Sequence, residues 1–224
     1  MILSQDKRFI FIHVPKAAGT SLNAALSLHD VFYPVRGAGP AIRHAHAEKA
    51  KLPPATADLG EHAAAKHFIA ALGRETYDGY YSFAFVRNPW DVAVSWFHYR
   101  LINPQVAGHK QAEAAGDFSS YVKRILAASD GAHWVGLQHP FVVDEAGDMA
   151  VTFIGRYESL MADFAAVTAR LGITTLELDH FNQSYHAPWA DLYTPETFAV
   201  VGGLVARDAA LFGYPADPAA YGIN

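Results

Sequence analysis

Two short segments carry residue types that could bind an anion. The first reads PKAAGTS and follows the apolar run Phe9–Val14 directly. Backbone N–H groups at the start of a helix lack intrahelical partners and carry partial positive charge, which favours an anion. Small side chains would let the backbone approach that anion, while the lysine and the hydroxyls would add donors; a tight turn with ordinary capping residues is the alternative. The predicted anion-binding residues are Lys16, Ala17, Ala18, Gly19, Thr20 and Ser21.

The order of residues in this loop differs from the Walker A motif of nucleoside triphosphatases. That motif, G-x-x-x-x-G-K-[ST], places its lysine after the second glycine and follows it with a hydroxyl that binds Mg²⁺. Here Lys16 comes three residues before Gly19, and no hydroxyl residue follows the lysine directly. No apolar strand ends in an aspartate of the Walker B type. A kinase that uses Mg²⁺-ATP would therefore lack its metal ligands.

The second segment begins at Arg87, which directly follows the apolar run Tyr80–Val86. Ser95 lies eight residues further on, within a predicted helix. A guanidinium can bind a phosphate through two parallel hydrogen bonds, and a neighbouring hydroxyl can donate another. The alternative is that Arg87 pairs with Asp91 and that Ser95 only packs against a neighbour.

Apolar runs and helix-period segments alternate along the chain, which predicts an α/β fold with a mainly parallel sheet. We expect one domain over residues 1–224, with irregular segments at 34–60 and 103–116. Ligands of such sheets bind beyond the carboxyl ends of the strands, where both polar segments fall. The predicted strands are 9–14, 80–86 and 174–178, with a hairpin of 141–143 and 151–154. The predicted helices are 20–28, 62–72, 88–99, 118–128, 160–171 and one that begins at Thr194.

Composition narrows the classes of function. The net charge of −5 argues against a general affinity for nucleic acid, because no basic excess is present to neutralise phosphates. Cysteine is absent, so disulfide and thiolate chemistry are excluded. No window of the sequence has the length of a membrane span, and the N-terminal apolar run is too short for a signal peptide. We therefore expect a soluble, cytoplasmic protein.

Taken together, the two segments resemble the motifs of the family-2, carbohydrate-type sulfotransferases. That family carries a strand–PKxGGTS–helix loop and an R-N-P-x-D-x-x-x-S motif, and this chain has alanine at position 18, where glycine is common. The likeness continues in 154–160, 182–196 and 211–214 and is weakest over 34–60 and 103–140. The resemblance implies a P-loop-like domain that binds 3′-phosphoadenylyl sulfate (PAPS). Lys16–Ser21 would hold its phosphosulfate, and Arg87 and Ser95 its 3′-phosphate.

The resemblance also implies a general base. A histidine ahead of the 3′-phosphate motif is the proposed base of carbohydrate-type relatives, and His62 lies 25 residues before Arg87. His67 is a weaker candidate, and the carboxylates of Glu61 and Glu48 are alternatives. His13 is interpreted as shaping the loop. Two further histidines, His44 and His46, lack a third ligand at suitable spacing and are interpreted as solvent residues.

These residues together predict a PAPS-dependent sulfotransferase. Sulfuryl transfer, like phosphoryl transfer, passes through a loose, in-line transition state in which positioning and charge stabilisation dominate. Lys16 would neutralise the leaving 5′-phosphate and His62 would take the proton of the acceptor hydroxyl, so no metal is required. The acceptor would be a small molecule or a saccharide, and the product nucleotide is PAP. The alternatives are a small-molecule kinase that uses Mg²⁺-ATP and a nucleotide-binding protein without catalytic activity.

Overall fold

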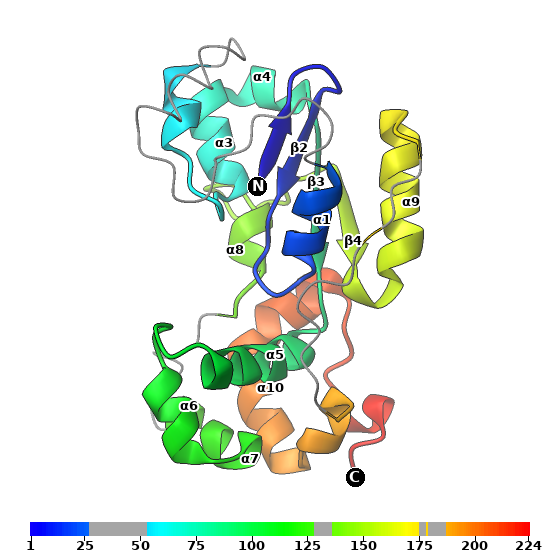
Figure 1. Cartoon of the computed structure of the whole chain (residues 1–224). Coiled ribbons are helices and arrows are strands. Elements are labelled where there is room, and N and C mark those ends of the chain that lie inside the picture. Colours follow the sequence, from blue (N-terminus) through cyan, green and yellow to red (C-terminus); the bar gives the residue numbers. More distant parts are fainter. Residues whose placement is uncertain (27–52, 128–135, 175–177, 179–186) are drawn as a thin grey trace. The chain divides into compact units, whose positions relative to one another are not determined.

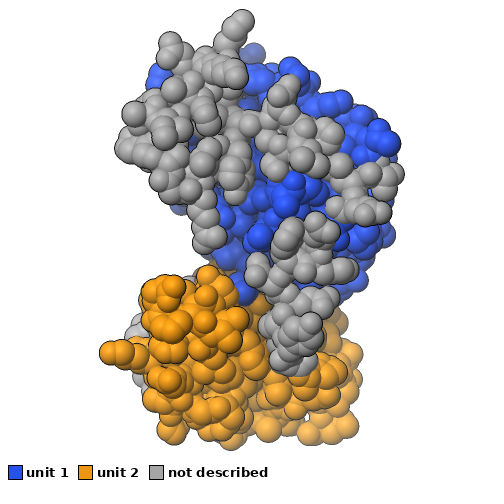
Figure 2. Space-filling model, in the orientation of Figure 1, with its two compact units in different colours: residues 1–86, 140–181 blue, residues 87–139, 182–224 orange. Residues whose placement is uncertain are grey.

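The computed structural model describes residues 1–26, 53–127, 136–174, 178 and 187–224 (Figure 1). Its residues group into two compact units, drawn in different colours in Figure 2. The first unit comprises residues 1–86 and 140–181, and the second comprises 87–139 and 182–224. The single-domain prediction stays a prediction. The predicted strand 174–178, His44, His46 and Glu48 lie wholly or mainly outside the described residues.

A four-stranded mixed sheet forms the centre of the first unit. Its strands are β1 (Ile2–Ser4), β2 (Phe9–Ile12), β3 (Tyr81–Val86) and β4 (Phe153–Arg156), in the spatial order β1-β2-β3-β4. β1 pairs antiparallel with β2, whereas the other two pairings are parallel. This confirms the predicted α/β fold with a mainly parallel sheet. The short strand β1 was not predicted.

Helices bury both the apolar strands and their own apolar faces. All four residues of β2 are buried, as expected of a central strand covered on both sides. α1 (Gly19–Leu26) and α9 (Leu160–Leu171) pack against one face of the sheet, and Phe11, Leu22 and Phe164 belong to the same apolar cluster. The end of α9 is as predicted, because Gly172 takes the left-handed conformation that closes many helices.

The other helical part of the first unit contains a 3₁₀ helix over Pro54–Asp58, α3 (Ala65–Leu72) and α4 (Arg74–Asp78). In Figure 1, α3 and α4 lie on the opposite side of the sheet from α9. The predicted helix 62–72 therefore begins three residues later than expected, and His62 lies in a turn before it. Gly73 ends α3 with a φ of 81°, as predicted for a C-cap glycine.

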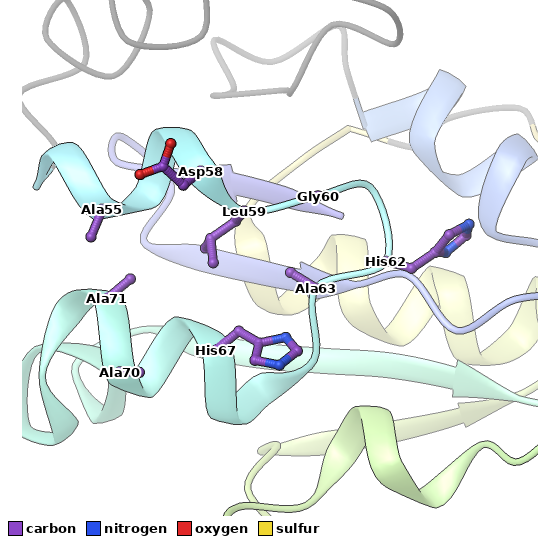
Figure 3. A pocket seen from close by; sticks show the side chains of 9 residues that line it. All are labelled: Ala55, Asp58, Leu59, Gly60, His62, Ala63, His67, Ala70 and Ala71. Atoms are coloured by element: carbon purple, nitrogen blue, oxygen red, sulfur yellow. The ribbon is translucent and has the colours of Figure 1, made fainter. Parts of the chain in front are cut away.

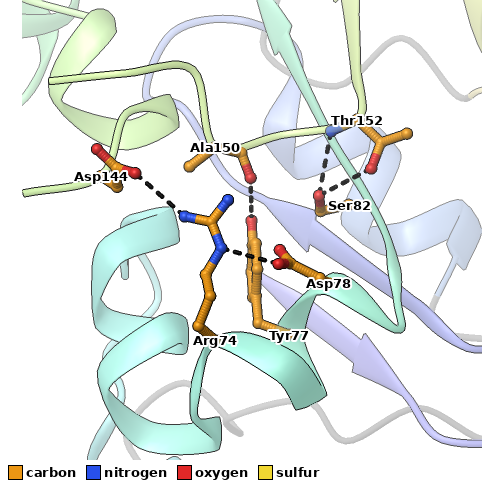
Figure 4. A network of polar contacts seen from close by, with 7 residues as sticks. All are labelled: Arg74, Tyr77, Asp78, Ser82, Asp144, Ala150 and Thr152. Atoms are coloured by element: carbon orange, nitrogen blue, oxygen red, sulfur yellow. Dashed lines mark hydrogen bonds and ion pairs between the residues drawn. The ribbon is translucent and has the colours of Figure 1, made fainter. Parts of the chain in front are cut away.

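A network of polar contacts joins α4 to the segment before β4 (Figure 4). Arg74 donates from Nε to Asp78 and from Nη1 to Asp144, at 2.9 and 3.1 Å. The buried hydroxyl of Tyr77 donates to the carbonyl of Ala150 at 2.8 Å. These contacts hold the two segments together although about seventy residues of sequence separate them.

The predicted hairpin of 141–143 and 151–154 is wrong. His139–Val142 forms the short helix α8, and only one antiparallel bridge, between Val143 and Met149, closes the turn around Asp144. β4 pairs instead with β3 in parallel. Pairing with the central strand buries the apolar side chains of β4 more effectively than a two-stranded hairpin could.

The described part of the second unit is helical. Its long helices are α5 (Pro89–Ile102) and α10 (Pro195–Phe212), which join at a stacked pair of rings, Trp90 and Phe198, with centroids 4.3 Å apart. The shorter helices are α6 (His109–Ala115), α7 (Phe118–Tyr121), a π-helical turn over Val122–Leu126, and two 3₁₀ helices over Trp189–Leu192 and Pro218–Tyr221.

Helix starts in the second unit follow the sequence closely. Asn88, Asp117 and Thr194 each accept a hydrogen bond from a backbone N–H of the first turn, as their positions predict. The predicted loop 103–116 is wrong, however, because α6 occupies half of it. Both of its cap residues are glycines with positive φ, Gly108 and Gly116, which the sequence analysis assigned to a loop.

Candidate anion-binding and proton-transfer site

The loop between β2 and α1 has an unusual backbone. Lys16 and Ala18 have φ angles of 66° and 62°, in the left-handed region that non-glycine residues seldom adopt, and Ala17 between them does not. Alternation of this kind turns successive N–H groups toward one side and forms a concave anion-binding surface. Each left-handed alanine or lysine costs about 1–2 kcal/mol, so the conformation is held by its surroundings. Glycine would adopt this conformation at position 18 without that cost.

Helix α1 continues directly from this backbone. Its first ladder bond joins the N–H of Leu22 to the carbonyl of Ala18 at 3.1 Å, so the N–H groups before Leu22 precede the helical ladder. Thr20 is exposed and Ser21 is buried, with 6% of its surface exposed. The loop thus combines a helix N-terminus, a left-handed alternation and the charge of Lys16, which together favour an anion.

The imidazole of His13 lies underneath this loop. It is 5% exposed, and Nδ2 of Asn23 lies 3.1 Å from its Nδ1. A Cβ atom built on Gly19 would fall 1.9 Å from Cδ2 and Nε2 of the ring, so only glycine fits there. This contact agrees with the interpretation that His13 shapes the loop, and it adds Asn23, which the sequence analysis missed.

His62 lies beside His13 in the turn before α3. The two ring centroids are 4.5 Å apart, and Nδ1 of His62 lies 3.1 Å from the backbone carbonyl oxygen of His13. A carbonyl oxygen can only accept, so Nδ1 carries the hydrogen and donates it. In the neutral ring Nε2 then has the lone pair, which is the state that a general base requires.

Glu61 completes a small cluster with the two histidines. Its Oε1 lies 3.8 Å from Nδ1 of His13, and one ligand atom from each of His13, Glu61 and His62 lies within 4.8 Å of the others. Two imidazoles and a carboxylate could hold a metal ion. In this structure Nδ1 of each ring already has a hydrogen-bond partner, which fixes the orientation of both imidazoles.

Arg87 follows β3 and opens the second unit. Its Nε and Nη2 donate to the two carboxylate oxygens of Asp91, at 2.6 and 2.8 Å, and both residues are buried. The alternative pairing considered for Arg87 is therefore present. A bidentate pair of this kind fixes the plane of the guanidinium. Ser95, further along α5, is buried with 3% exposure.

The backbone of Arg87 is held by residues that the sequence analysis missed. The side-chain amide of Gln138 accepts from the N–H of Arg87 at 2.8 Å and donates to its carbonyl at 2.7 Å. Asp208, fully buried, accepts from the backbone N–H groups of Gln138 and His139 and lies 2.6 Å from Nδ1 of His139. No local motif marks these residues, because they are 51 and 70 positions away from the groups they hold.

Comparison with known proteins gives one finding. A model described as the sulfotransferase family matches residues 1–197 of the chain. No curated protein matches the sequence. Within the part of the chain that the structure describes, every helix is too short or too polar to cross a membrane.

Proposed function

Because the chain belongs to the sulfotransferase family, in its family-2 branch, we propose that it transfers a sulfuryl group from PAPS to an acceptor hydroxyl. The left-handed alternation of Lys16 and Ala18 at the start of α1 carries this proposal. A strained backbone that turns its N–H groups to one side at a helix N-terminus is suited to a doubly charged phosphosulfate.

The donor-binding residues follow from charge and hydrogen-bonding capacity. The loop Lys16–Ser21 would bind the phosphosulfate, with Lys16 neutralising the charge that grows on the leaving 5′-phosphate. Arg87 and Ser95 would bind the 3′-phosphate, and Asp91 would hold the guanidinium of Arg87 in one plane. When bound, PAPS supplies the sulfuryl group, and its loss leaves PAP.

His62 is the proposed general base. Its Nδ1–H is directed to the carbonyl of His13, so Nε2 would accept the proton of the acceptor hydroxyl. The acceptor oxygen then forms the new bond to sulfur, and the bond between sulfur and the 5′-phosphate oxygen breaks. Because Lys16 and the loop already supply positive charge at the leaving group, the reaction needs no metal ion.

Calorimetric titration with PAP in the absence of Mg²⁺ tests the donor site. We expect tight binding of PAP and weak binding of ADP, which lacks the 3′-phosphate. Arg87→Ala should weaken PAP binding about 10- to 100-fold, as expected for a lost charge-assisted contact. Lys16→Ala should also weaken it. Arg207→Ala and Lys7→Ala, which remove exposed positive charges in the same two units, should leave it unchanged.

The same titrations separate the alternatives. Better binding of Mg²⁺-ATP than of PAP would replace the sulfotransferase with a kinase. Tight PAP binding without turnover of any hydroxyl acceptor would leave a nucleotide-binding protein without catalytic activity. His62→Ala should keep PAP affinity while lowering turnover about 10²- to 10⁴-fold, the usual contribution of a positioned base. Normal turnover in that variant would remove His62 from the reaction.

A further inference from the structure

A cavity of about 690 Å³ opens beside His62 in the first unit (Figure 3). The 3₁₀ helix Pro54–Asp58, the following turn and α3 form its walls. Most of the described side chains that line it are small and apolar: Ala55, Leu59, Ala63, Ala70 and Ala71. In Figure 3, His62 lies at one end of the cavity with its ring directed away from the alanines, Ala55, Ala70 and Ala71 lie at the other end, and His67 lies between them.

The two histidines of the cavity offer opposite hydrogen-bonding groups. His62 donates through Nδ1 to the carbonyl of His13, which leaves Nε2 of the neutral ring as a proton acceptor. The backbone N–H of Ala64 donates to Nδ1 of His67 at 3.1 Å. Nδ1 of His67 is therefore the acceptor, and its Nε2 carries the hydrogen. A molecule in the cavity thus meets the hydrogen-bond donor of His67. It reaches the base only with a group that extends past the His62 end, because the ring of His62 points away from the alanines.

The small number of polar side chains limits what the cavity can bind. Among the described lining residues only Asp58, His62 and His67 have polar side chains. A saccharide presents a hydroxyl on most of its carbons, and each hydroxyl that leaves water without a partner weakens binding. Apolar walls also disfavour an acceptor with a charge, because the charge loses water there. Alanine walls instead favour a molecule with an apolar body.

We propose that this cavity receives the acceptor, and that the acceptor is an uncharged alcohol with a mainly apolar body and one hydrogen-bond-accepting group, such as a carbonyl or ether oxygen. Its hydroxyl lies at the His62 end, its accepting group meets Nε2–H of His67, and its body covers the alanines of α3. The assignment of the hydroxyl end rests on the proposed function. His67, the weaker candidate for the general base, is then a residue that determines specificity.

Three simple alcohols test this assignment. Methyl 4-(hydroxymethyl)benzoate is neutral and has an ester carbonyl, 4-(hydroxymethyl)benzoate differs by its negative charge, and 4-methylbenzyl alcohol lacks the carbonyl. Binding is followed by saturation-transfer NMR with PAP present, and turnover by release of PAP from PAPS. We expect the ester to have a kcat/KM about tenfold or more above that of either analogue and of a uronic acid oligosaccharide.

A charge placed on the apolar wall provides the matched test. Ala70→Asp should raise the KM for the ester about tenfold and remove its NMR signal, while PAP affinity stays unchanged. Ala166→Asp places the same charge at an exposed alanine of α9 in the same unit, and should change neither. An ester that binds Ala70→Asp as well as it binds the unmodified protein would remove the cavity from acceptor binding.

His67→Asn separates recognition from structural support. Asparagine can still accept from the N–H of Ala64, but it lacks the donor at the position of Nε2. We expect an unchanged melting temperature and loss of the preference for the ester over 4-methylbenzyl alcohol. Preferred transfer to the charged saccharide, or no binding of the ester although PAP binds, would overturn the acceptor class. Failure of PAP to bind would count against the proposed function, while the NMR signal of the ester would still report on the cavity.

Discussion

The imidazole of His13 occupies the space that a side chain at Gly19 would need. A Cβ atom at Gly19 would lie 1.9 Å from Nε2 of the ring, far inside van der Waals contact. The same histidine holds His62 through its backbone carbonyl. One residue at the end of β2 therefore shapes the proposed anion-binding loop and orients the proposed base, which couples the two parts of the candidate site.

Gly19→Ala should displace His13 or the loop. We expect a loss of stability of about 1–3 kcal/mol, as for other overpacked sites, and a large loss of PAP affinity. Truncation of the ring in a Gly19→Ala, His13→Ala double variant should restore part of the PAP affinity. Gly203→Ala is the control, because nothing lies within 4 Å of its added Cβ and α10 should gain about 0.5–1 kcal/mol. Calorimetry and urea unfolding measure both effects, and an unaltered Gly19→Ala protein would contradict the contact.

Ala18→Gly should stabilise the protein. Its φ of 62° costs an alanine about 1–2 kcal/mol, and glycine removes that cost. Glycine also gives the unfolded chain more conformational entropy, which opposes folding by about 0.5–1 kcal/mol. A net gain in the free energy of unfolding of up to about 1 kcal/mol follows, with PAP affinity retained. The neighbouring Ala17→Gly should destabilise, because Ala17 is buried and outside the left-handed region. Equal effects of the two substitutions in urea unfolding would argue against the left-handed alternation.

Gln138→Leu should indirectly weaken the proposed 3′-phosphate site at Arg87. It removes both hydrogen bonds to the backbone of Arg87 and leaves a buried N–H and carbonyl without these partners. Such unsatisfied groups cost about 1–3 kcal/mol each, so we expect lower stability together with weaker PAP binding. The exposed Gln111→Leu on α6 is the control and should change neither quantity. If Gln138→Leu binds PAP as tightly as the unmodified protein, the hydrogen bonds from Gln138 to the backbone of Arg87 have no role in binding.

Tyr77 should make stability depend on pH in alkaline solution. Burial raises the pKa of Tyr77 to about 12, from the ordinary tyrosine value of 10.0. Between these values the unfolded chain holds fewer protons than the folded protein, so the free energy of unfolding falls as pH rises. The loss attributable to this group is at most about 2–3 kcal/mol. The Tyr77→Phe variant lacks this titrating group, so its free energy of unfolding, measured by urea unfolding, should fall less between these pH values. Parallel curves of unfolding free energy against pH for the two proteins would contradict the assignment.

The sequence by itself determined the local elements and the chemistry they carry. The apolar runs of β2 and β3, the caps at Asn88 and Thr194, and the order of the two polar segments are local patterns, because each depends on residues within one or two turns of chain. The predictions of secondary structure failed where a local signal was short or ambiguous. β1 has only three residues, and the segment of α6 reads as a loop because glycines flank it.

Tertiary structure alone decided which side chains meet. Nδ1 of His62 donates to the carbonyl of His13, which lies 49 residues away in the sequence. The side chain of Gln138 accepts from the backbone N–H of Arg87, which is 51 residues away. No periodicity encodes such partners, since they depend on how β2, β3 and the helices are placed after folding. The tautomer of His62 follows from its contact with His13. The left-handed backbone of Ala18 likewise depends on tertiary structure, because a strained φ persists only where its surroundings hold it.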